Sequence, residues 1–97
     1  MQLARVVGSA VASMKEATMT GTKLLLVEDV GRDVKAGPAA PYVAVDLVGA
    51  GEGELVLVSL GSPAAKAVSH EGSTVDAVIV GIVDTLRREG KTIYQKD

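Results

Sequence analysis

Apolar residues recur along this chain in short runs that are separated by segments rich in glycine, proline and polar residues. The runs are rich in β-branched residues, and several alternate with polar positions, which is typical of strands. Gly8 interrupts the first run and indicates a bend or bulge. We expect five strands, with loops at 13–22 and 31–41 between them, at residues 3–12, 23–30, 42–48, 54–60 and 75–83.

The pattern changes character after the fourth run. Ser62 and Pro63 are suited to the N-cap and first position of a helix, so we expect one or two helical turns that end between residues 68 and 72. Residues 84–88 are predicted to form a short turn of helix. Glu89 and Gly90 predict a turn before a final short strand at 92–96.

Five or six closely spaced strands with one short helix predict an all-β fold, a small oligonucleotide-binding-like β-barrel. The chain has 97 residues, so residues 1–97 are expected to form a single domain. Hydrophobic residues make up 47% of the chain but aromatic residues only 2%, so valine and alanine must fill the core. Such small side chains bury little area each, which favours a protein that gains further burial by association.

The runs at 23–30 and 75–83 are apolar on both faces. Two-faced apolar strands normally belong to parallel sheets that helices cover. Because no such helices are expected here, we infer that neighbouring copies of the chain cover part of the outer barrel wall. An exposed apolar wall would otherwise promote aggregation.

Charge and composition exclude several classes of function. The net charge is −2 and the chain lacks a basic patch and a stacking aromatic platform, so nucleic acid and anionic membranes are not expected partners. Cysteine is absent, which excludes disulfides and thiolate chemistry, and no signal peptide or membrane span is evident. His70 is the only histidine and has no partner set for a metal site. We expect no metal and no cofactor.

The segment from Gly49 to Glu54, here called the glycine loop, is the most distinctive stretch of the sequence. Its order is Gly49, Ala50, Gly51, Glu52, Gly53, Glu54. The Gly-x-Gly-x-Gly spacing and the strand that follows it do not fit a dinucleotide fingerprint, which needs a helix N-terminus. A tight hairpin, or a loop packed against another copy of the chain, explains the glycine spacing better. Gly51 is expected to resist substitution by valine, and the Glu54 carboxylate to accept hydrogen bonds from backbone N–H groups.

Three carboxylates adjoin predicted strands: Asp46, Asp76 and Asp84. A paired-carboxylate enzyme would use such groups as acid and base. The alternative is that they cap turns, or bind backbone amides at the ends of the barrel or at subunit contacts. Because the sequence lacks a combination of nucleophile, base and orienting group, we predict that the protein is not an enzyme.

The order of these segments resembles the EutN/CcmL family of bacterial microcompartment vertex proteins along nearly the whole chain. The family pattern matches the first strand with Gly8 and the late strand at 75–84. It also matches residues 23–27 after Gly21, and the run from 43 to 54 that contains the glycine loop. The family often has glycine where this chain has Ala4, and an apolar residue where it has Glu52.

The resemblance implies a structural shell protein of the bacterial cytoplasm that forms homopentamers with a narrow five-fold pore. These pentamers would cap the vertices of a microcompartment shell that hexameric and pseudohexameric proteins otherwise tile. The glycine loop would then lie near the five-fold axis or at the subunit contact. If Glu52 faces the axis, five copies form an acidic ring that favours cations; if it faces outward, it is solvated. The alternative function is a free-standing oligonucleotide-binding-type barrel that binds a ligand or nucleic acid.

Overall fold

The computed structural model describes residues 1–12, 22–61 and 76–97. Within these ranges the chain is almost entirely β-structure, and the only helical element is a single short 3-10 segment, η2. The predicted helix at 62–72 lies outside the described residues. The elements are β1 (Gln2–Ala10), β2 (Lys23–Asp29), η2 (Arg32–Val34), β3 (Tyr42–Asp46), β4 (Leu55–Leu60), β5 (Ala77–Ile82), β6 (Thr85–Arg88) and β7 (Lys91–Gln95).

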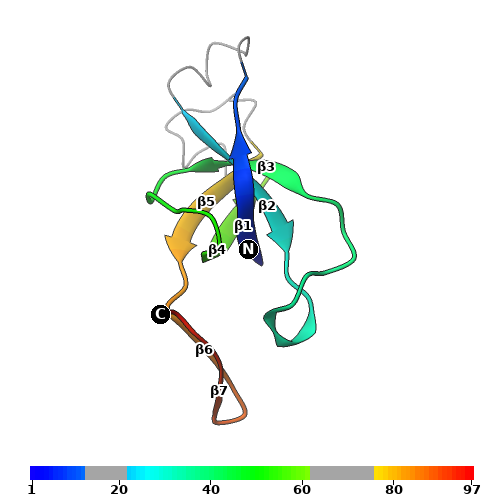
Figure 1. The fold of residues 1–97 in the computed structure, drawn as a ribbon, viewed down its shortest axis with the longest axis vertical. Coiled ribbons are helices and arrows are strands. Elements are labelled where there is room, and N and C mark those ends of the chain that lie inside the picture. Colours follow the sequence, from blue (N-terminus) through cyan, green and yellow to red (C-terminus); the bar gives the residue numbers. More distant parts are fainter. Residues whose placement is uncertain (13–21, 62–75) are drawn as a thin grey trace.

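Five strands close into a barrel in the order β1-β2-β3-β5-β4 (Figure 1). β3 and β5 are parallel, with Val45 opposite Val78, and the other neighbouring pairs are antiparallel. Closure removes the free sheet edges that would otherwise pair with other chains. The prediction of a small all-β barrel is confirmed, and the five expected barrel strands agree with the observed ones to within a few residues at each end.

The barrel interior is packed mainly with valine and alanine, as the composition predicts. In β1, Ala4 and Val6 are buried, whereas Arg5 and Val7 on either side are more exposed, which is the alternation of a strand with one buried face. The pairing of β1 with β2 shifts between Val6 and Gly8, so the bulge expected at Gly8 is confirmed. The buried cluster comprises Ala4, Val6, Leu25, Val27, Ala44, Ala50, Val56, Val58, Ala77 and Ile79.

A second apolar cluster lies on the outer face of the barrel. Leu24, Val45 and Val78 are buried together although the structure contains a single copy of the chain. The apolar residues on both faces of β2 and β5 are therefore partly explained within one chain, and this part of the outer wall needs no neighbouring copy. Val7 and Val43 do remain exposed, at 38% and 44%.

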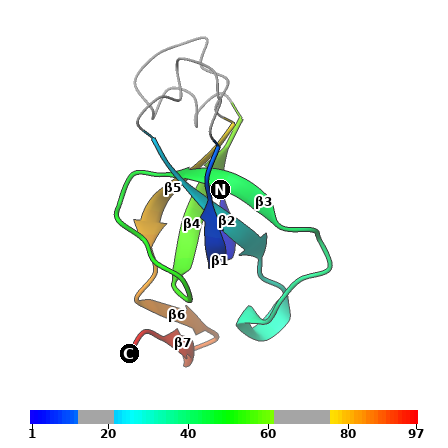
Figure 2. The same ribbon diagram turned by 45° about the horizontal axis from the view of Figure 1, so that its top comes forward.

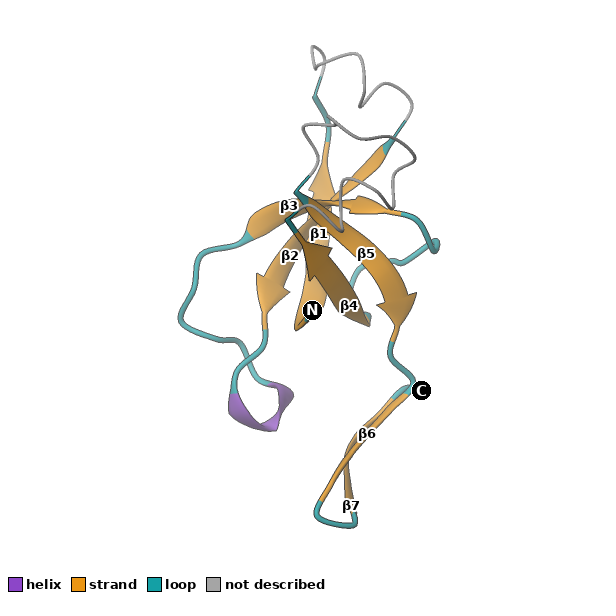
Figure 3. Cartoon of the chain, turned by 180° about the vertical axis from the view of Figure 1, so that it is seen from behind, coloured by secondary structure: helices purple, strands orange, loops and turns teal. Residues whose placement is uncertain are grey.

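The last two strands form a hairpin outside the barrel, here called the C-terminal hairpin (Figure 2). Figure 3 shows it extending away from the barrel beyond the end of β5. The helical turn predicted for 84–88 is wrong, because these residues include strand β6. Leu86 pairs with Tyr94 across the hairpin, and this contact with a later strand overrides the local preference. Glu89 and Gly90 form the predicted turn, with φ of 53° and 78°.

Candidate functional site: the glycine loop and its anchors

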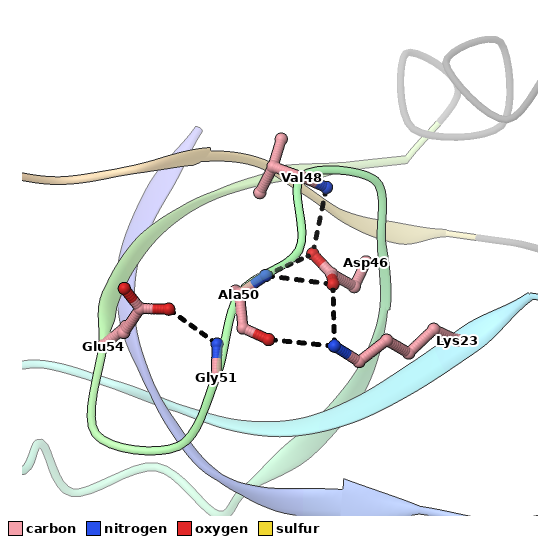
Figure 4. A network of polar contacts seen from close by, with 6 residues as sticks. All are labelled: Lys23, Asp46, Val48, Ala50, Gly51 and Glu54. Atoms are coloured by element: carbon pink, nitrogen blue, oxygen red, sulfur yellow. Dashed lines mark hydrogen bonds and ion pairs between the residues drawn. The ribbon is translucent and has the colours of Figure 1, made fainter.

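Asp46, the last residue of β3, organises the start of the glycine loop. Its side chain is 1% exposed. One carboxylate oxygen accepts hydrogen bonds from the backbone N–H groups of Val48 at 3.1 Å and Ala50 at 3.3 Å, and the other accepts from Ala50 at 3.1 Å (Figure 4). The expectation that Asp46 binds backbone amides at the end of a barrel strand is confirmed. A buried carboxylate with these donors fixes the backbone that leaves β3.

Lys23 completes this arrangement from the neighbouring strand. It lies opposite Asp46 in the β2–β3 pairing, and its Nζ is 3.4 Å from Asp46 Oδ2. The same ammonium donates a hydrogen bond to the Ala50 carbonyl oxygen at 3.1 Å. Sequence reasoning missed this residue, because a lysine at the start of a strand has no local signal that separates an anchor from a solvated charge.

Glu54 holds the other end of the loop. Its Oε1 accepts a hydrogen bond from the Gly51 N–H at 2.7 Å, and its Oε2 forms an ion pair with Lys96 Nζ at 2.6 Å. The ion pair and the amide bond together lower the pKa of Glu54, and Glu54 in turn raises the pKa of Lys96. The expected bond from a backbone N–H to Glu54 is thus present, and it forms within one chain.

Arg5 of β1 links the loop to more distant elements. Its guanidinium donates to the carbonyl oxygens of Gly53 at 2.8 Å and Val34 at 3.3 Å, and it lies 5.9 Å from the centre of the Tyr94 ring. The backbone of β1 pairs here as well, since the Gly53 N–H donates to the Val6 carbonyl at 2.8 Å. Arg5 and Lys96 therefore both connect the glycine loop with the C-terminal hairpin.

Two glycines of the loop have a backbone conformation that other residues rarely adopt. The φ of Gly49 is 79° and that of Gly53 is 87°. Gly51 is different: its φ is not positive, and a Cβ added there would lie 3.7 Å from Glu54 Oε1, an ordinary contact distance. The expected constraint on backbone conformation therefore falls on Gly49 and Gly53 rather than on Gly51.

The remaining loop residues divide into one buried anchor and an exposed tip. Ala50, the second residue of the loop, is 1% exposed and belongs to the barrel core, so the loop is attached to the core near its start. Glu52 and Gly53 are exposed in the single chain. The loop thus presents an acidic side chain on a backbone that polar contacts hold on both sides.

Most of the polar contacts around the glycine loop go to backbone N–H and carbonyl groups and so hold the conformation of the loop. Among the described residues, no group of three histidine, cysteine or acidic side chains could hold a metal ion.

The other polar residues considered from the sequence lie away from the glycine loop in the chain. Asp76 and Asp84 use their backbone carbonyls to accept hydrogen bonds from the N–H groups of Gly61 and Lys96. Tyr42 donates its hydroxyl to Asp29 at 2.7 Å; burial and this bond raise the pKa of the tyrosine. His70 lies outside the described residues.

No helix in the described part of the chain has the length and apolar character that a membrane crossing requires.

Comparisons with known proteins agree with one another. A family model described as "Ethanolamine utilisation protein EutN/carboxysome" matches residues 1–84. The chain is 50% identical over 90 residues to the bacterial microcompartment shell vertex protein PduN of Salmonella typhimurium, covering 89% of this chain and 98% of the relative. It is 44% identical over 97 residues to the carboxysome shell vertex protein CcmL of Synechocystis sp., covering 99% of this chain and 95% of the relative.

A solved structure, the GrpN pentameric microcompartment shell protein from Rhodospirillum rubrum, superimposes with a TM-score of 0.82. It is 41% identical, and the match covers 91% of this chain and 99% of that one.

Proposed function

The chain belongs to the EutN/carboxysome family of bacterial microcompartment shell vertex proteins, and from this premise we propose that five copies form a ring that caps a shell vertex. Its role is structural, and its place is the shell of a microcompartment in the bacterial cytoplasm. The observation that carries the proposal is the likeness to a pentameric relative over nearly the full length of both chains.

A closed shell needs five-fold rings for a geometric reason. A flat hexagonal lattice cannot close on itself, so a polyhedral shell tiled by hexamers requires five-fold units where it turns. We therefore propose that hexameric and pseudohexameric shell proteins are the partners at the edges of the ring. Residues 1–97 would serve as one shell-protein domain.

Native mass spectrometry of the purified chain tests the ring directly. We expect one dominant species with the mass of five chains at micromolar concentration. A species that stays monomeric under these conditions would overturn the pentamer, and would favour the alternative of a free-standing barrel that binds a ligand or nucleic acid.

We further propose that the glycine loop faces the five-fold axis and narrows a pore there. Three features support this. The loop is held on both sides by contacts within one chain, its tip is exposed, and Glu52 projects an unburied charge. Five such carboxylates would form an acidic ring that favours cations over anions.

A Glu52→Cys variant tests this placement, because the natural chain contains no cysteine. If the tips converge on the axis, mild oxidation of the folded pentamer should link chains through disulfides. Val11→Cys is the matched control, since Val11 is 96% exposed and lies outside the loop. A pentamer in which Glu52→Cys forms no more disulfides than this control would remove the loop from the axis.

A further inference from the structure

The C-terminal hairpin lacks a core of its own. Val83 is the last buried residue, and no residue from 84 to 97 is buried, although this segment carries Leu86, Ile93 and Tyr94. A two-stranded hairpin is marginally stable in water unless its face packs against something else. Ile93 is 37% exposed in the isolated chain, so the hairpin has an apolar side chain that is free to be covered.

The base of the hairpin is nevertheless fixed to the barrel. Lys96 forms its ion pair with Glu54, and Arg5 lies over the Tyr94 ring. The Lys96 N–H donates to the Asp84 carbonyl at 2.7 Å, which closes the hairpin at its base. These contacts present the hairpin in a defined direction away from the barrel, as Figures 1 and 3 show. A projecting element that is fixed at its base loses little conformational freedom when it binds.

The barrel wall offers a matching surface, here called the outer patch: Val7, Leu26 and Val43. These residues lie on three neighbouring strands, where Leu26 is opposite both Gly8 of β1 and Val43 of β3. Val7 and Val43 are exposed and Leu26 is half-buried. Unlike Leu24, Val45 and Val78 on the same wall, the outer patch is left uncovered by its own chain.

We propose that the C-terminal hairpin of one copy docks on the outer patch of the next copy around the ring. This rests on the proposed pentamer. A five-membered ring requires a heterologous interface, in which two different surfaces of the chain meet. The hairpin and the outer patch are two such surfaces, because each carries apolar side chains that its own chain leaves exposed: Ile93 on the hairpin, and Val7 and Val43 on the patch. Docking would cover both at once and would continue identically around the ring.

Cross-linking between introduced cysteines tests the contact without background, because the chain has none of its own. In an Ile93→Cys/Val43→Cys variant, a short bismaleimide should join consecutive copies and give a ladder of up to five linked chains on a denaturing gel. Each single variant should stay largely unlinked. Ile93→Cys/Val48→Cys is the matched control, since Val48 has a similar exposure of 39% but lies next to the glycine loop.

The outcomes separate this inference from the proposed function. A pentamer in which Ile93→Cys/Val43→Cys gives no ladder, links only within one chain, or links no better than the control overturns the docking and leaves the pentamer intact. A wild-type chain that is monomeric overturns both.

A measurement on the wild-type chain guards against variants that misfold. Hydrogen exchange of the β6 and β7 amides should slow at least tenfold between a dilute, dissociated sample and the assembled ring. Exchange in the hairpin that is unchanged by assembly would also overturn the docking.

Discussion

The glycine loop and the C-terminal hairpin both reach the surface of the molecule, but they differ in what holds them in place. The loop carries a buried residue, Ala50, and a carboxylate anchor at each end, Asp46 and Glu54. The hairpin has antiparallel strand pairing, with a shift of register between Leu86 and Arg87, but it has no buried residue. Strand pairing and burial within one chain are therefore separate properties. A loop without strand pairing can be held by a few polar contacts and one buried residue, whereas a hairpin with paired strands can depend on packing from outside.

Removal of the Asp46 carboxylate should weaken the loop most. Asp46→Ala leaves the Val48 and Ala50 N–H groups without their acceptor, and we expect the free energy of unfolding to fall by about 2–4 kcal/mol. Urea unfolding at a fixed chain concentration measures this. Lys23→Met is the control, because Lys23 is 56% exposed and its ion pair should contribute less than about 1 kcal/mol. Equal losses for the two variants would contradict the assigned role of Asp46.

Backbone conformation gives the next largest effect. Gly53→Ala forces a side chain into a φ of 87°, which should cost about 1–2 kcal/mol. Gly51→Ala makes the same chemical change at a position without a positive φ and with room for the added carbon, so it should change stability little. Thermal unfolding of the two variants side by side tests the difference. If Gly51→Ala proved the more damaging, the described loop conformation would be wrong.

The link between the two regions should depend on pH. Because folding lowers the pKa of Glu54, its contribution to stability is complete above its ordinary pKa of 4.5 and is lost as the pH falls through the folded value. Because folding raises the pKa of Lys96, its contribution is complete below 10.5 and is lost as the pH rises through the folded value.

The Gly51 amide proton, observed by NMR, reports on the acid side of this behaviour. Its resonance should titrate with a midpoint below the ordinary pKa of glutamate. Lys96→Met should move that midpoint upward, whereas Lys91→Met, an equal loss of charge at an exposed position of β7, should leave it nearly unchanged. If Lys96→Met left the midpoint unchanged, the ion pair between Lys96 and Glu54 would not hold the hairpin to the loop.

Local patterns in the sequence predict the barrel strands, the bulge at Gly8 and the turn at Glu89 and Gly90, because each depends on neighbouring residues. Asp46 is predictable for the same reason, since its amide partners follow within four positions. The contact from Arg5 to Gly53 spans 48 positions and arises only when β1 meets β4 in the closed barrel. Likewise, Lys23 meets Asp46 through the register of two strands. Strand β6 has only four residues, and they become a strand by pairing with β7, so their local pattern alone led to the incorrect prediction of a helical turn.

The position of β5 has a consequence for how the protein is made. In the barrel, β5 lies between β3 and β4, although it follows both along the chain. A nascent chain on the ribosome therefore cannot complete the wall until Ile82 has emerged, after the other four strands of the barrel. Contacts between residues distant in sequence also form slowly. Each subunit should thus close its barrel only after β5 has left the ribosome, so newly made copies depend on this late step before they can join a shell.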